Sequence, residues 1–152
     1  MDKLVEFLAN WTKEYLKSKN TVTKSLVSVE EKGTELVARF KDREQRIVIA
    51  PFMNSFAEVL GELTKNPEMH LAVVTFNSEK SFKALLENWK ELVKHRNFNI
   101  YFVNPFSQLD KRWIIFPFTH AKICDEDSLE LGLKSMFEMV DRISEEEAKG
   151  KI

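Results

Sequence analysis

The chain has 152 residues, of which 43% are hydrophobic and 31% charged, and its formal net charge is −1. These values are typical of one globular domain, and they exclude a disordered chain and a strongly basic nucleic-acid-binding protein. The single cysteine excludes an internal disulfide, and every apolar run is shorter than the roughly 20 residues of a membrane helix. We therefore expect a cytoplasmic protein with no membrane segment and no signal peptide. The high Lys and Glu content is typical of a thermophile.

Apolar residues at helical spacing predict an amphipathic helix over residues 4–16. Alternating patterns then predict three strands, at residues 22–30, 36–40 and 46–51. Turn signals separate the three strands, at Lys32-Gly33 and at residues 41–44. This order predicts an antiparallel meander.

The next region predicts helices and buried strands in alternation. A short helix over residues 55–63 follows a capping-box pattern, and Ser78 is placed to cap a longer helix that ends near residue 93. Continuous apolar runs at 71–76 and 99–103 predict strands that are buried on both faces. A strand, a helix and a strand in this order imply a right-handed crossover between parallel strands.

The last part of the chain is predicted to contain a loop, a strand and a helix. The loop covers residues 104–110, the strand residues 113–118, and the helix residues 127–143, with residues 119–127 as a second loop. We expect residues 146–152 to be a frayed charged tail. The prediction is therefore one α/β domain over residues 1–145, with a mixed sheet of five to six strands flanked by about four helices.

No linear catalytic or cofactor motif occurs in the sequence, so no cofactor and no metal site is predicted. His120 and Cys124 have a spacing that suits a thiolate–base pair, but we interpret Cys124 as a small buried apolar residue. The acidic run Asp125-Glu126-Asp127 is interpreted as capping and dipole compensation at a helix start.

The order of helices and strands up to residue 104 resembles the restriction-endonuclease-like fold of the PD-(D/E)XK nucleases, in particular their Mrr-like branch. The segments that carry the resemblance are residues 47–51, residues 71–78, the long helix after them, and residues 99–103. The resemblance implies an acid near the start of the second strand and a Glu-x-Lys type pair on the third, which together hold Mg²⁺.

The sequence departs from that pattern on its third strand. Glu35 matches the first acidic position, but residues 46–51 contain neither an acid nor a lysine at the required spacing. The resemblance therefore implies a degenerate nuclease that has lost catalysis. Small acidic domains of the secretion-chaperone type also begin with a helix and a three-strand meander, and they are the second fold that the chain resembles.

Three functions are compatible with the sequence. The first is a non-catalytic adaptor that contacts a protein partner or nucleic acid. The second is a chaperone-like or homodimeric interaction module, and the third is a small enzyme with a dispersed site around Glu35, Asp42, His120 and Asp125. For a contact surface, the sequence offers the hairpin cations and a tryptophan that follows two cations. These residues are Arg39, Lys41, Arg43, Arg46, Lys111, Arg112 and Trp113.

Overall fold

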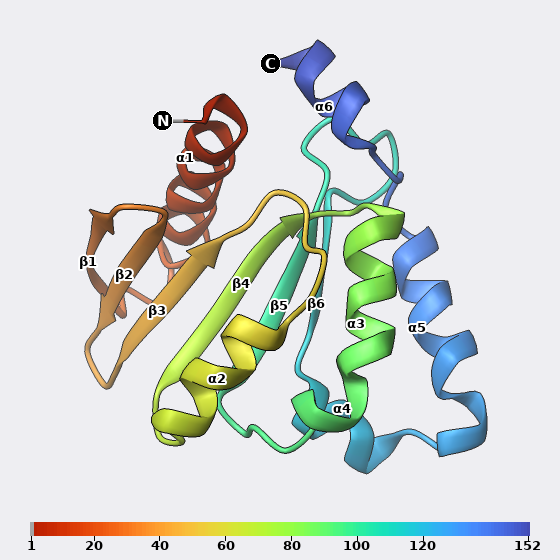
Figure 1. Ribbon diagram of the computed structural model, residues 1–152. Helices are drawn as coiled ribbons and strands as arrows, with labels where there is room; N and C mark the ends of the chain where they lie inside the picture. The colour runs from red at the N-terminus through yellow and green to blue at the C-terminus, as the bar shows by residue number, and fades with distance from the viewer. Residues whose placement is uncertain (1) are drawn as a thin grey trace.

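The computed structural model describes residues 2–152, which form one α/β domain around a six-stranded sheet (Figure 1). The strands are β1 (Leu26–Lys32), β2 (Glu35–Phe40), β3 (Glu44–Ile49), β4 (His70–Phe76), β5 (Phe98–Val103) and β6 (Arg112–Ile115). The α-helices of this part of the chain are α1 (Lys3–Lys19), α2 (Ala57–Lys65), α3 (Glu79–Leu92), α4 (Pro117–Ile123), α5 (Leu129–Glu138) and α6 (Glu145–Lys151). A short 3₁₀ helix, η1 (Glu126–Ser128), precedes α5.

The strands lie in the sheet in their order along the chain, β1-β2-β3-β4-β5-β6. β1, β2 and β3 pair antiparallel, β3, β4 and β5 pair parallel, and β6 returns antiparallel to β5. The predicted mixed sheet, with a meander and a parallel strand-helix-strand unit, is therefore confirmed. The described residues form six α-helices, where the sequence predicts about four.

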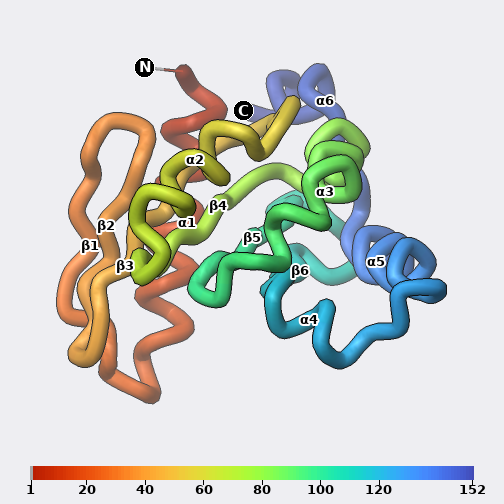
Figure 2. Tube along the Cα trace, turned by 60° about the horizontal axis from the view of Figure 1, so that its bottom comes forward, coloured from red at the N-terminus to blue at the C-terminus, as the bar shows by residue number. Residues whose placement is uncertain are grey.

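Helices cover both faces of the sheet and bury two hydrophobic clusters. Figures 1 and 2 show α1 behind the sheet and α2 and α3 in front of it. The cluster on the α1 side includes Leu8 and Phe76, and it also takes in Ala148 from α6. The cluster on the opposite face includes Phe56, Leu85 and residues from α5. The alternation of side chains along each strand divides the core in this way.

Three of the α-helices, α1, α3 and α6, begin at a residue whose side chain caps them. The backbone N–H of Leu4 donates to the Asp2 carboxylate at 2.8 Å, and the N–H of Ser81 donates to the Ser78 hydroxyl at 3.1 Å. The second bond confirms Ser78 as the cap of α3. The turn between β1 and β2 contains Gly33 at a φ of +65°, a conformation that glycine adopts without steric cost.

The prediction for residues 113–127 is wrong in part. β6 ends at Ile115, and the segment expected to continue the strand and then form a loop is instead the helix α4, followed by η1. Pro117 is the first residue of α4. Proline suits this position because its fixed φ is helical and its missing N–H would have no helical partner there.

The prediction for the C-terminal region is also corrected. α5 ends at Glu138, a turn follows at Met139, and Val140 then forms a parallel bridge with Asp110. Residues expected to be a frayed tail form α6, which begins with a complete capping box between Ser144 and Glu147. Ala148 is fully buried against the α1 side of the core, which gives this short helix an apolar anchor. Within residues 2–152, no helix combines the length and the apolar character needed to cross a membrane.

Candidate functional site

The hairpin cations predicted as a contact surface are mostly paired with neighbouring carboxylates. Arg39 lies 3.3 Å from Glu44, and Arg43 lies 3.1 Å from Asp42. Lys41 is exposed, and no ion pair of its side chain is found among residues 2–152. Pairing of this kind neutralises the charge that a phosphate backbone would require.

The other predicted contact residues are also engaged inside the molecule. The Lys111 ammonium donates to two backbone carbonyls of its own loop, and the Arg112 guanidinium lies over the Tyr15 ring at 4.7 Å. Trp113 is only 5% exposed, and its indole N–H donates to Asn77 at 2.7 Å. The expectation that Trp113 lies on a surface is therefore wrong, because its ring packs in the core beneath α3.

The seven residues do not gather on one face of the sheet. Arg112 contacts α1, which covers one face, whereas Arg46 is 3.4 Å from Glu62 on α2, which covers the other. Arg112 and Trp113 are neighbours on β6, so their side chains point to opposite faces of the sheet.

Glu35, the residue that the resemblance predicts as a metal ligand, forms an ion pair. Glu35, at the start of β2, accepts two hydrogen bonds from the Arg46 guanidinium on β3, at 2.8 and 2.9 Å. The hydrogen bonds to Glu35 also raise the pKa of Arg46. The guanidinium occupies one lone pair on each oxygen and places a positive charge beside the carboxylate, which opposes the approach of a cation.

The four residues of the dispersed enzyme site are not brought together. Glu35 is on β2 and Asp42 in the turn after it, whereas His120 is on α4 and Asp125 follows that helix. Figures 1 and 2 both place the β1–β3 meander on one side of the molecule and α4 on the other. These residues therefore form no common site.

The carboxyl ends of the parallel strands, where α/β proteins often bind ligands, are closed by the chain itself. Asn77 is fully buried there and donates to the carbonyls of Phe137 and Val140, at 3.0 and 2.9 Å. The cavity that remains has a volume of about 290 Å³, and an ion pair between Arg142 and Glu79 lies in its wall. At this edge, Asn77 thus holds the end of α5 and the residues that follow it.

A larger hollow lies between α3, α4 and the start of α5, and we call it the α3–α5 groove. Its volume is about 660 Å³, within the range of ligand sites. Apolar side chains form most of its surface: Leu86, Trp89, Val93, Ala121 and Leu129. The polar residues at its rim are Lys90, Cys124, Glu126 and Glu130.

The local sequence explains why one wall of the groove is apolar but not fully buried. Leu85, Trp89 and Leu92 of α3 point into the core, while Leu86 and Val93 lie at the edge of the same stripe and are half-buried. Residues 86, 89, 90 and 93 repeat at three- and four-residue intervals, so they follow one side of the helix for two turns. α3 therefore presents a partly exposed apolar strip beside α4.

His120 lies next to the groove and carries an unusual buried nitrogen. Its ring meets Trp89 edge to face, with ring centroids 5.7 Å apart, and its Nε2 is buried without a hydrogen-bond partner among residues 2–152. Burial lowers the pKa of His120 below its ordinary value of 6.5. Burial therefore favours the neutral form of the imidazole. Cys124, one turn further on, is half-buried at the rim.

Sequence reasoning recognised the apolar stripe of α3 but assigned all of it to the core. Ala121 is not predicted as a wall of the groove, because residues 119–127 are expected to be a loop, and Leu129 is predicted only as part of the apolar face of the last helix. The signal that could have been used is Pro117 followed by six residues without glycine, a pattern typical of a helix start.

The groove has the composition of a binding site rather than of a metal centre. Across residues 2–152, no group of three or more His, Cys, Asp or Glu side chains is arranged to hold a metal ion. What the groove offers is an apolar surface next to a tryptophan edge, with charges only at its rim. No protein-family model matches the chain, and no curated protein or solved structure matches it either.

Proposed function

We propose that this chain is a non-catalytic binding domain with a nuclease-like core, and that it binds a protein partner through the α3–α5 groove. The groove itself is the observation that carries the proposal. A half-buried apolar strip two turns long, flanked by a second helix, is the kind of surface into which the apolar side of a partner helix packs.

The loss of catalysis is supported by the ion pair of Glu35. In a nuclease of this type the acid at the start of the second strand would be available to Mg²⁺, whereas here Arg46 engages both of its oxygens. The element order, a helix, a meander and a parallel strand-helix-strand unit, is the one on which the resemblance rests. The proposal is that such a core was retained for binding.

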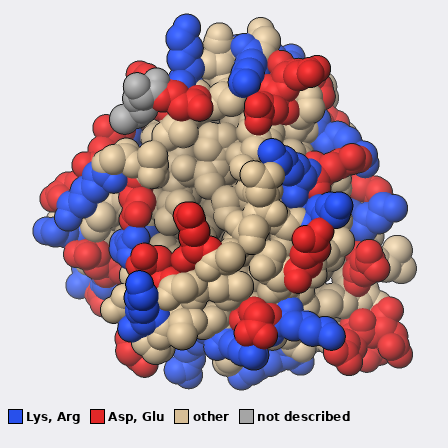
Figure 3. All heavy atoms as spheres, in the orientation of Figure 1, with Lys and Arg blue, Asp and Glu red and all other residues tan. Residues whose placement is uncertain are grey.

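A protein partner is favoured over nucleic acid by the state of the cations. Of the seven residues predicted to contact a partner, all but Lys41 have their charged or polar groups engaged by other parts of the chain. Figure 3 shows basic and acidic side chains interspersed over the face that carries α2 and α3. A surface of mixed sign gives little attraction for a polyanion.

The test uses two substitutions on the same helix. Ala121 and Thr119 are both exposed on α4, but only Ala121 lines the groove. Ala121→Trp fills the groove without disturbing the core, and Thr119→Trp is the matched control. Helical peptides selected from a display library against the wild-type chain are then measured with both variants by fluorescence anisotropy.

We expect the selected peptides to lose about tenfold or more in affinity with Ala121→Trp, a change of about 1.4 kcal/mol, and to bind Thr119→Trp normally. Equal binding to both variants would contradict the proposal. Labelled single-stranded and duplex DNA and RNA are measured alongside, at low and at physiological salt. Binding of any of them at physiological salt would also contradict a protein-only interface.

A further inference from the structure

The rim of the α3–α5 groove is strongly acidic on one side. Residues 123–133 contain four carboxylates and no lysine or arginine. These carboxylates belong to Asp125, Glu126, Asp127 and Glu130. Figure 3 shows acidic side chains gathered at the lower right of the molecule, over η1. Glu126 and Glu130 line the groove directly.

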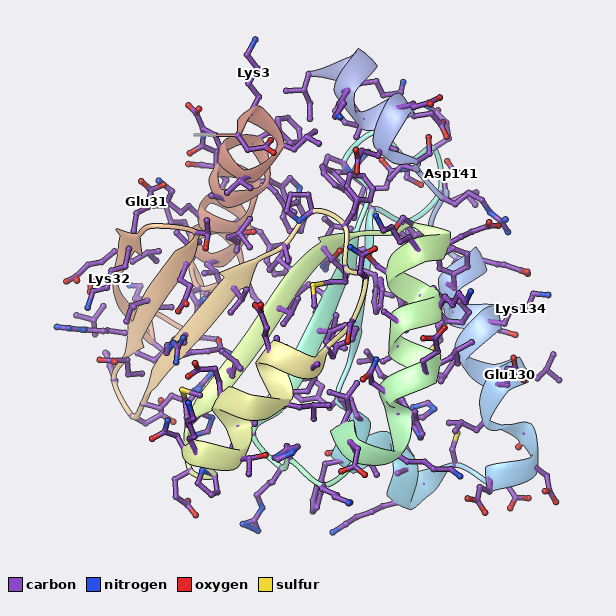
Figure 4. The ribbon with its side chains drawn as sticks, viewed as in Figure 1. Lys3, Glu31, Lys32, Glu130, Lys134 and Asp141 are labelled. Carbon is purple, nitrogen blue, oxygen red and sulfur yellow. The ribbon has the colours of Figure 1, made fainter. Side chains whose placement is uncertain are left out.

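In the described part of the chain, the side chains of these carboxylates have no hydrogen-bonding or ionic partner. Neither η1 nor α5 has a hydrogen bond from its backbone to a capping side chain, so the capping role predicted for the acidic run is wrong, whereas Glu126, Asp127 and Glu130 do lie in first helical turns, as dipole compensation requires. Within residues 2–152, none of the four takes part in an ion pair or accepts a hydrogen bond at its side chain. Figure 4 shows Glu130 and, one turn later, Lys134 on the side of α5 that is turned away from the sheet.

The opposite wall of the groove has little free positive charge to offset these carboxylates. On α3, Lys83 is near Glu87, and Lys94 is 2.9 Å from Glu91, so these lysines are paired with acids of the same helical segment. Only Lys90 reaches the rim from that side. The groove therefore combines an apolar floor with one acidic wall.

We infer that the occupant of the α3–α5 groove is a basic amphipathic helix of a partner protein. This inference rests on the proposed function and adds the chemistry of the partner. The apolar stripe of the partner helix packs against Leu86, Trp89 and Val93, and its lysines or arginines lie along Glu126 and Glu130. Charge complementarity of this kind selects the partner and fixes its orientation more than it adds affinity.

The dimensions of the groove limit the contact. Leu86 to Val93 is two turns of α3, or about 10.5 Å at 1.5 Å per residue. A partner helix that lies beside it presents apolar anchors at positions i, i+3 or i+4, and i+7. Cations on one flank of this stripe are then on the side of the acidic wall.

Three synthetic peptides of about five turns test the inference. The first has leucines at the anchor positions and lysines on the flank, and the second replaces each of these lysines by glutamate. The third contains the residues of the first in an order that has no apolar stripe. Binding is measured by fluorescence anisotropy at low and at physiological salt, with the wild-type chain, Ala121→Trp and Thr119→Trp.

We expect the basic striped peptide to bind at least about tenfold more tightly than the acidic one at low salt, with a smaller ratio at physiological salt because ions screen exposed charges. The double variant Glu126→Gln/Glu130→Gln should remove this preference. The matched control, Glu138→Gln/Glu146→Gln, changes two exposed acids that do not line the groove and should leave the preference intact.

The outcomes separate this inference from the proposed function. Equal binding of the two striped peptides, both blocked by Ala121→Trp, would overturn the basic partner and leave the groove as the interface. Equal binding of the basic peptide without a stripe would overturn the helical occupant. If no peptide binds, and light scattering shows a dimer that Ala121→Trp dissociates, the occupant is a second copy of the chain and the inference is wrong. Binding that Ala121→Trp does not change would overturn both.

Discussion

The carboxylate of Glu35 on β2 and the guanidinium of Arg46 on β3 form a two-pronged ion pair, with N–O distances of 2.8 and 2.9 Å. Both side chains are about 30% exposed, so solvent screens the pair only in part. We expect a coupling energy of about 1 kcal/mol from a double-mutant cycle of Glu35→Ala and Arg46→Ala in urea denaturation. The exposed pair Asp42 and Arg43 serves as the control, with a coupling near zero. Equal coupling in the two pairs would show that the bidentate geometry adds nothing.

The same ion pair predicts the absence of metal-dependent cleavage. Because Arg46 engages both oxygens of Glu35, we expect purified protein to leave DNA and RNA intact in the presence of Mg²⁺ or Mn²⁺. The measurement is a gel assay over a range of protein concentrations, with Glu35→Ala as the control. Cleavage that rises with protein concentration and disappears in Glu35→Ala would contradict the interpretation of a lost active site.

Asn77 is predicted to be one of the most sensitive polar positions in the fold. It is fully buried, donates to the carbonyls of Phe137 at the end of α5 and of Val140 after it, and accepts from the Trp113 indole at 2.7 Å. Asn77→Leu leaves these three groups buried without partners, and we expect a loss of about 3 kcal/mol or more in the free energy of unfolding. Asn88→Leu is the control, since Asn88 bonds only within its own helix and should cost less than about 1 kcal/mol. Similar losses in the two variants would mean that the buried network is not what holds the C-terminal region.

The buried imidazole of His120 predicts a pH dependence of stability. Burial lowers the pKa of His120 in the folded state, so the unfolded chain takes up a proton more readily. The contribution of His120 to stability is therefore constant above the ordinary pKa of 6.5. It falls as the pH drops below 6.5, and it levels off once the pH is below the folded-state pKa. Burial also lowers the pKa of His95, which contributes in the same direction.

The variant His120→Phe separates the contribution of His120 from the rest. It removes the group that takes up the proton, so we expect it to gain stability relative to the wild type as the pH falls from 7.5 to 5.0. This range runs from about one unit above to about one and a half units below an ordinary histidine pKa. Urea denaturation at several pH values measures this difference, and His95→Gln reports the second histidine. A difference between His120→Phe and the wild type that does not change with pH would contradict the burial of a neutral imidazole.

The reactivity of the Cys124 thiol measures access to the groove without a ligand. Its thiol is half-buried at the rim, so we expect it to react with a thiol reagent such as dithionitrobenzoate in the native state, more slowly than in urea. Ala121→Trp should slow the native reaction by roughly several-fold, because the indole blocks the reagent's access to the thiol. Thr119→Trp should not slow it. Equal rates in the two variants would show that residue 121 does not control access to the groove.

The strands and long helices could be predicted where one physical pattern dominates. The apolar runs at 71–76 and 99–103 are buried on both faces, so nearly every residue had to be apolar, and both strands are found there. The apolar stripe of α3 and its cap, Ser78, could also be predicted from the sequence. Residues 113–123 were misjudged because a four-residue strand is followed directly by a seven-residue helix, and neither is long enough to establish its period.

The candidate site could not be predicted from the same patterns. A groove forms where two helices are not in contact, and the sequence does not show where that is. The spacing of Leu86 and Val93 is the same whether their side chains are covered or half-exposed. The state of the charges was also hidden, since Glu35 and Arg46 are 11 residues apart and meet only because β2 and β3 pair in a particular register. Trp113 is named as a possible contact residue because two cations precede it, but its own position on the strand directs it into the core.

The sequence by itself determined the α/β class, the meander and the parallel crossover, because hydrophobic periodicity records which side of each segment is buried. The tertiary structure decided which cations are neutralised, that α6 is anchored by Ala148, and that an apolar groove with an acidic wall remains open between α3 and α5. Those features arise from contacts between segments far apart in the chain. Local patterns of residues do not indicate which distant segments will contact each other.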